Sequence, residues 1–334
     1  MLYLPSQPLP GALVCQRGST VETRTALTAS LTSDLTVIRA DTADLLSPAK
    51  PGEPVHPAIA ALRSGALPIG DVPFVQAAAR VAGIALPRVS CYPQALRGML
   101  GRTVLTTEAD AVVGWARAGT SLLAEGMFVK PVRTKLFTGF VLNELAIKWG
   151  DNPAVVSGLR SLEADPESTE GRAVMAELMA EGDREGVDPH ALAEAALQWA
   201  SLQACFCDEQ VWVSPAVEVV AEWRLYVQGS PGGYATLAEA RYDPCGPPKL
   251  APPPASWTAE LLALAASDPH APASLALDVG WLRGADGELT PALIEANDAW
   301  ALGLYGRCMS PLAWVQFLWT RWDQLRSAGA VAGA

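Results

Sequence analysis

Along the first 90 residues, short apolar runs alternate with polar connectors rich in proline and glycine. Runs at 11–14 and 35–38 have the length of buried strands, whereas residues 72–82 show the spacing of apolar residues that is typical of a helix. This succession of strands and helices predicts a small α/β lobe over residues 1–92.

From residue 93 onward the pattern predicts a larger α+β region. Residues 151–207 show helical spacing and interrupt its strands, so we interpret them as an insertion, with Asp188 as N-cap and Pro189 as first residue of its last helix. The elements expected up to this helix are a short helix at 93–100, a strand at 103–105, a helix at 107–117 capped by Thr107, strands at 127–131 and 135–141, and helices at 169–181 and 189–205.

The last third of the chain is mostly strand. Three runs are expected to pair in sequence as a β-meander, and two later runs form a hairpin through a polar turn at 284–288. The expected elements are strands at 210–215, 217–228 and 234–242, a helix at 255–267, hairpin strands around Asp278 and Glu295, and a closing helix at 310–325.

The hairpin places three oxygen-bearing side chains near one another. Apolar residues surround Asp278 and precede Glu295, and Asn297 follows two positions later. Two carboxylates and an amide oxygen suit a hard cation such as Mg²⁺, which proteins hold with one or two carboxylates and the phosphates of a nucleotide. The alternative is that these polar residues simply flank the end of a strand.

Two features upstream indicate an anionic ligand. Lys130 and Lys135 lie on either side of a strand-turn-strand and reach the same anion, unless each is an ordinary residue at a strand end. Strand alternation puts Glu222 and Arg224 on one face, where the arginine either binds phosphate or pairs with that glutamate.

Composition narrows the class of protein. Half of the 334 residues are apolar, yet no stretch is long enough to span a membrane and no signal-like segment begins the chain, which favours a cytoplasmic protein. Six cysteines and three histidines show no disulfide or metal-ligand spacing. The net charge of -11 argues against nucleic acid or anionic lipid as a partner.

Four sequence motifs, in order, resemble the ATP-grasp superfamily and its branch named for one arginine and two lysines. They are FVKP with KLFTGFV, VWVSPAVEVVAEWRLYV, ALDVGW and LIEANDAWALGLYG. The resemblance covers residues 93–305. It implies an α+β ATP-grasp fold, in which two α+β subdomains grip ATP, over residues 93–334 after the lobe at 1–92; the acidic insertion at 151–207 departs from the family pattern.

The resemblance also implies a role for each residue of the motifs, with ATP and Mg²⁺ as cofactors. Lys130 and Lys135 contact the phosphates, Arg224 and Lys135 act in catalysis, and Arg307 meets a substrate carboxylate. Backbone groups near Val211 and Val213 bind adenine, Glu218 binds the ribose, and Asp278, Glu295 and Asn297 hold the metal.

These roles imply a carboxylate-amine ligase that works through an acyl phosphate on amino acids or small peptides. An ATP-grasp phosphotransferase for a small molecule and a nucleotide-binding module without turnover remain alternatives, because both use the same ATP and metal groups. The insertion has eleven acidic residues and three arginines, a net charge of 3 − 11 = −8. It either closes over a cationic amine or forms a solvated helical pair.

Overall fold

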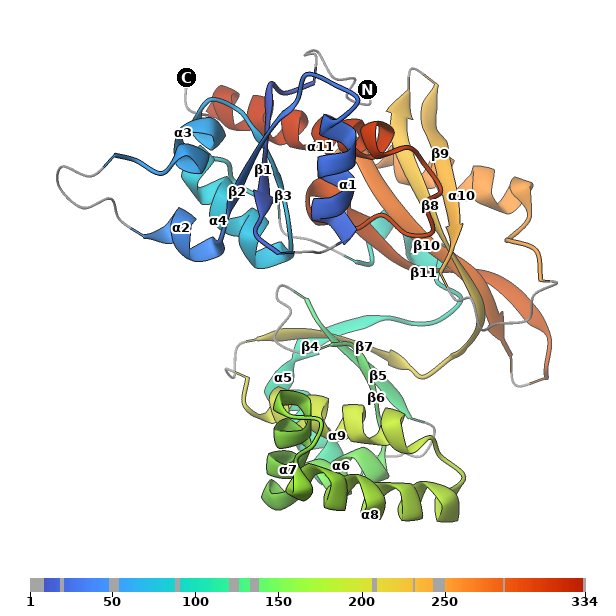
Figure 1. Ribbon diagram of the computed structural model, residues 1–334. Helices are drawn as coiled ribbons and strands as arrows, with labels where there is room; N and C mark the ends of the chain where they lie inside the picture. Colours follow the sequence, from blue (N-terminus) through green and yellow to red (C-terminus); the bar gives the residue numbers. More distant parts are fainter. Residues whose placement is uncertain are drawn as a thin grey trace. The chain divides into compact units, whose positions relative to one another are not determined.

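The computed structural model describes residues 9–18, 21–47, 54–87, 91–119, 126–132, 138–205, 209–230, 232–242, 250–284 and 286–332. Helices and strands both contribute substantially, which confirms the expected α+β class (Figure 1). The chain divides into two compact units, here called unit 1 (Met1–Gly101 with Val219–Ala334) and unit 2 (Arg102–Glu218). The domain boundary expected at residue 92 stays a prediction. Within the described residues, no helix is both long and apolar enough to cross a membrane.

The N-terminal lobe of unit 1 has the α/β arrangement expected from the sequence. Its sheet has the strand order β2-β1-β3, and β1 pairs in parallel with both neighbours. Helix α4 follows its predicted limits because the Asp71 side chain accepts a hydrogen bond from the backbone N–H of Phe74, and Gly83 ends the helix in the left-handed conformation. The elements are β1 (Ala12–Gln16), α1 (Val21–Ser30), β2 (Thr36–Ala40), α2 (Thr42–Leu46), α3 (Pro57–Arg63), β3 (Leu67–Ile69) and α4 (Val72–Ala82).

The remainder of unit 1 is built on a four-stranded sheet of order β11-β10-β8-β9. Its C-terminal helix α11 and the N-terminal lobe share one hydrophobic core, in which Leu13, Phe74, Tyr226 and Trp314 are all fully buried. This shared core ties the lobe to the sheet that carries the predicted metal ligands. The elements are η1 (Gln94–Met99), β8 (Glu218–Ser230), β9 (Gly233–Arg241), α10 (Ala255–Ser267), β10 (Ser274–Arg283), β11 (Leu289–Asp298), η3 (Ala299–Ala301) and α11 (Pro311–Ala332).

Unit 2 packs helices against an antiparallel sheet of order β4-β7-β5-β6. Helices α5, α6 and α9 share a core with the strands, and Trp199 of α9 is fully buried there. Helix α9 begins as expected, with the Asp188 side chain accepting from the N–H of His190 and Pro189 in the first turn. The elements are β4 (Leu105–Glu108), α5 (Ala109–Arg117), β5 (Met127–Pro131), β6 (Phe140–Leu142), α6 (Glu144–Gly150), α7 (Pro153–Ala164), α8 (Thr169–Glu185), α9 (Pro189–Gln203) and β7 (Gln210–Pro215).

The expected β-meander is wrong. Strand β7 pairs with β4 on one side and β5 on the other, so both of its edges are occupied within unit 2. Strand β8 belongs instead to the sheet of unit 1, beside β9 and β10. Consecutive strands of similar pattern therefore lie in two different sheets.

The expected N-cap of the helix at 107–117 is also wrong. Thr106 and Thr107 belong to strand β4, paired with Trp212 and Val211, and helix α5 begins only at Ala109. Strand pairing outweighs the capping tendency here because threonine is a good strand former. The strand expected at 135–141 is observed as β6 from Phe140, and the first part of that range lies outside the described residues.

Close packing between β8 and β10 supplies a test of the unit 1 sheet. A Cβ atom added to Gly280 would lie 2.4 Å from the carbonyl oxygen of Ala221. Because backbone must move to relieve that contact, Gly280→Ala is expected to lower the free energy of unfolding by about 1–3 kcal/mol. Gly11→Ala is the control, since nothing lies within 4 Å of its added Cβ, and its effect stays within about 0.5 kcal/mol. Equal unfolding curves for the two variants would contradict this packing.

Candidate active site

The hairpin of β10 and β11 brings the three predicted metal ligands onto one face. Asp278 lies directly opposite Glu295 in the antiparallel pair, and a bulge follows between Asp278 and Val279. Opposite residues of such a pair project to the same side, and Asn297 returns to that side two positions after Glu295. The register therefore gathers the three side chains, as the sequence predicts.

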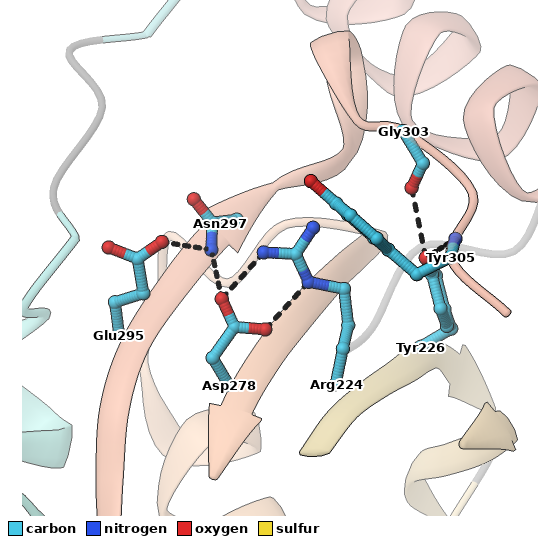
Figure 2. A network of polar contacts seen from close by, with 7 residues as sticks. All are labelled: Arg224, Tyr226, Asp278, Glu295, Asn297, Gly303 and Tyr305. Atoms are coloured by element: carbon cyan, nitrogen blue, oxygen red, sulfur yellow. Dashed lines mark hydrogen bonds and ion pairs between the residues drawn. The ribbon is translucent and has the colours of Figure 1, made fainter. Parts of the chain in front are cut away.

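Arg224 of β8 completes this group from the neighbouring strand. Its Nε donates to Oδ1 of Asp278 and its Nη2 donates to Oδ2, both at 2.6 Å (Figure 2). Arg224 is 5% exposed and Asp278 is 1% exposed. Two short parallel hydrogen bonds make this a bidentate ion pair, which compensates two charges that are both removed from water.

The amide of Asn297 bridges the two carboxylates. Its Nδ2 donates to Oδ2 of Asp278 and to Oε1 of Glu295, at 2.9 Å each. A donor shared by two carboxylates marks a point of strongly negative potential. We call Arg224, Asp278, Glu295 and Asn297 the carboxylate cluster; with both acids ionised, its formal charge is −1.

The carboxylate cluster has unusual electrostatics because it is buried. Burial raises the pKa of Asp278 to about 6, while the hydrogen bonds and charge of Arg224 lower it and the nearby Glu295 raises it further. Burial by itself lowers the pKa of Arg224, but its contacts with Asp278 outweigh this and raise the pKa well above its usual value. At neutral pH the two groups therefore form a charged pair.

The donor set fits Mg²⁺. Among the described residues, no group of three or more His, Cys, Asp or Glu side chains is placed to hold a metal. A cation at the carboxylate cluster would accordingly take two carboxylates and one amide from the protein. This is the small protein contribution typical of Mg²⁺ sites that are completed by phosphates and water.

Three tyrosines border the carboxylate cluster, and sequence reasoning missed all of them. The guanidinium carbon of Arg224 lies 4.6 Å from the ring centre of Tyr305 and 5.3 Å from that of Tyr242. Tyr226 lies two residues after Arg224, so strand alternation puts both on one face of β8. That spacing was the available signal for Tyr226; Tyr242 and Tyr305 come from segments whose approach depends on the tertiary fold.

Arg307 lies outside this network of contacts. It is exposed, and with a φ of 51° it is the non-glycine residue with positive φ in the part of the chain that the structure describes. Its neighbour Gly306 is also left-handed, at 66°, so the two residues form a sharp turn after β11. The contact of Arg307 with a substrate carboxylate stays a prediction.

The remaining predicted residues belong to unit 2. Lys130 lies opposite Trp212 in the β5–β7 pair, on the face away from buried Val129, whereas Lys135 lies outside the described residues. Val211 and Val213 are buried in the middle of the sheet, with strand neighbours on both sides. Glu218 is exposed at the junction of the two units, as the first residue of β8. Their roles stay predictions.

The family comparison covers most of these positions. Residues 183–313 match a family model described as an ATP-grasp domain, family 2 of the clade named for one arginine and two lysines. The match includes the whole carboxylate cluster and strand β7, but Lys130 lies before it. It begins within α8, so helix α9 falls inside the matched segment although the sequence pattern assigned it to the insertion.

Comparison with solved structures gives distant likenesses. The chain is similar to N5-carboxyaminoimidazole synthetase from Staphylococcus aureus, with 10% identity and a TM-score of 0.48 over 96% of this chain and 79% of that one. It is similar to the D-alanine-D-alanine ligase from Coxiella burnetii, with 11% identity and a TM-score of 0.42 over 96% and 98%. It is similar to the L-amino acid ligase from Bacillus licheniformis, with 12% identity and a TM-score of 0.38 over 87% and 67%. A comparison with curated protein sequences gives no match.

Proposed function

The segment 183–313 is an ATP-grasp domain of the clade named for one arginine and two lysines, and from this premise we propose that the protein is an ATP- and magnesium-dependent ligase that joins a carboxylate to an amine. The observation that carries the proposal is the carboxylate cluster. A buried arginine, two carboxylates and an amide converge on one face of the matched segment. A structural ion pair has no use for the additional carboxylate of Glu295.

Asp278, Glu295 and Asn297 are the residues that would hold the metal, with Asn297 turning its amide oxygen towards the cation. Bound Mg²⁺ bridges phosphate oxygens and neutralises charge on the departing diphosphate. Arg224, already oriented by Asp278, donates hydrogen bonds to the transferring phosphoryl group, where charge develops. Lys130 donates to the nucleotide phosphates as a compact point charge.

The reaction proceeds in two transfers. A substrate carboxylate oxygen attacks the γ-phosphorus of ATP, and the bond to ADP breaks, which yields an acyl phosphate. The amine nitrogen of a second substrate then attacks the acyl carbon; phosphate leaves with the bonding electron pair, and the amine loses a proton to the solvent. Amino acids or small peptides supply both groups in this proposal.

Trapping with hydroxylamine tests the first transfer. The protein is incubated with ATP, Mg²⁺ and a panel of amino acids and dipeptides, with hydroxylamine in place of the amine. We expect ADP release together with a hydroxamate of at least one acid, detected by mass spectrometry. ADP formation with a phosphorylated hydroxyl compound and no hydroxamate would show a phosphotransferase instead, and no ADP with any acid would contradict turnover.

A further inference from the structure

Arg224 is enclosed on two sides. Asp278 binds two of its guanidinium nitrogens, and the third, Nη1, points away from that carboxylate (Figure 2). The rings of Tyr305 and Tyr242 lie against the guanidinium, with their centres 4.9 Å apart and their planes at 47°. A cation in contact with an aromatic face gains electrostatic energy, so the rings favour one orientation of the group.

Tyr305 is not fixed by its own burial, because its side chain is 39% exposed. Its backbone is instead fixed by Tyr226, whose hydroxyl accepts a hydrogen bond from the N–H of Tyr305 and donates one to the carbonyl of Gly303, both at 2.9 Å. Tyr226 itself is fully buried and packs edge-on against Phe317 of α11, at 5.6 Å between ring centres. The hydroxyl of one core residue thus holds the loop that carries the Tyr305 ring.

We propose that Tyr226 and Tyr305 are positioning residues for Arg224. The buried Tyr226 hydroxyl fixes the loop at 303–305, the Tyr305 ring then fixes the guanidinium against Asp278, and Nη1 stays directed at the anion that forms during phosphoryl transfer. Preorganised donors of this kind act mainly in the transition state. The inference rests on the proposed function for its catalytic consequence, but the restraint on Arg224 exists without turnover.

Two tyrosine-to-phenylalanine variants separate positioning from stability. Tyr226→Phe removes the hydroxyl that holds the loop, whereas Tyr234→Phe removes a hydroxyl that donates to the carbonyl of Pro272, away from the carboxylate cluster. Each variant loses a hydrogen bond to backbone, so similar losses of thermal stability are expected. We expect kcat of Tyr226→Phe to fall about tenfold with KM for ATP within about twofold, as misorientation of a retained group predicts, and kcat of Tyr234→Phe to stay at the wild-type value.

A second readout does not depend on activity. The ¹H–¹⁵N signal of Arg224 Nε, assigned by its loss in Arg224→Lys, should broaden or shift in Tyr226→Phe and remain unchanged in Tyr234→Phe. Tyr305→Leu removes the ring without touching the buried hydroxyl and should reproduce both effects if Tyr226→Phe does not fold. Equal kcat values and equal Arg224 signals in all folded variants would overturn the inference. A wild-type protein without ADP release, but with the expected signal changes, would overturn the proposed function and leave the restraint on Arg224 standing.

Discussion

Replacing Glu295 with glutamine is expected to abolish ATP turnover while the fold stays intact. The change removes one negative charge from the metal ligands and keeps the shape of the side chain, and Glu295 is only partly buried. Loss of a ligand that neutralises phosphate charge costs several kcal/mol in the transition state, so we expect kcat to fall by at least about a hundredfold. ADP release at saturating ATP and Mg²⁺ measures this loss.

Glu288→Gln provides the matched control. This glutamate is exposed in the turn of the same hairpin, so its replacement should preserve both kcat and melting temperature. Wild-type turnover by Glu295→Gln would contradict the metal assignment. Asp278→Asn is a less informative variant, because it also deprives the buried Arg224 guanidinium of its charged partner and so affects stability.

Removing Arg224 is expected to produce the largest loss of stability. Arg224→Met leaves the Asp278 carboxylate buried without its cation, and breaking a buried pair from one side costs about 3–5 kcal/mol. The double variant Arg224→Met/Asp278→Leu removes both charges and should recover most of that free energy of unfolding, since apolar replacements of a buried pair are often neutral. Urea unfolding curves of the single and double variants measure the difference.

Turnover should follow a different order from stability. Neither variant should release ADP, because the recovered stability does not restore the guanidinium or the metal ligand. A single variant as stable as the wild type would contradict the energetic role of the ion pair. A stable double variant with normal turnover would contradict the catalytic role of both residues.

Elements with local signals were predictable from the sequence. The limits of α4 follow from Asp71 and Gly83, and the hairpin register of Asp278 and Glu295 follows from apolar alternation on both sides of one turn. These signals reside within a few residues of the element itself. The amino-acid pattern alone therefore brings the three oxygen ligands together on one hairpin, as the structure has them.

Features that depend on distant segments were not predictable in the same way. The pattern of β7 fits a strand but does not specify neighbours, so its pairing with β4 and β5 was missed. The approach of Tyr242 and Tyr305 to Arg224 likewise depends on where two loops return to the sheet. Arg224 itself was expected, but its bidentate contact with Asp278 required the order of strands in the sheet.

The predicted insertion combines two kinds of helix. Helix α9 contributes Trp199 and Leu202 to the core that covers the unit 2 sheet, so it is an integral layer of this unit. Part of the acidic character is also used internally, since buried Glu181 forms ion pairs with Lys148 and Arg184. The proposal that this segment favours a cationic amine must therefore rest on its exposed carboxylates alone.

Calorimetric titration with ADP, in the presence and absence of Mg²⁺, tests the magnesium-dependent nucleotide site most directly. We expect ADP to bind the wild-type protein and Mg²⁺ to tighten this binding at least about tenfold, a gain of about 1.4 kcal/mol, and we expect Glu295→Gln to bind ADP without that gain. Absence of ADP binding by the wild type, or an undiminished effect of Mg²⁺ in Glu295→Gln, would contradict the assignment of the carboxylate cluster as the metal site of an ATP-dependent ligase.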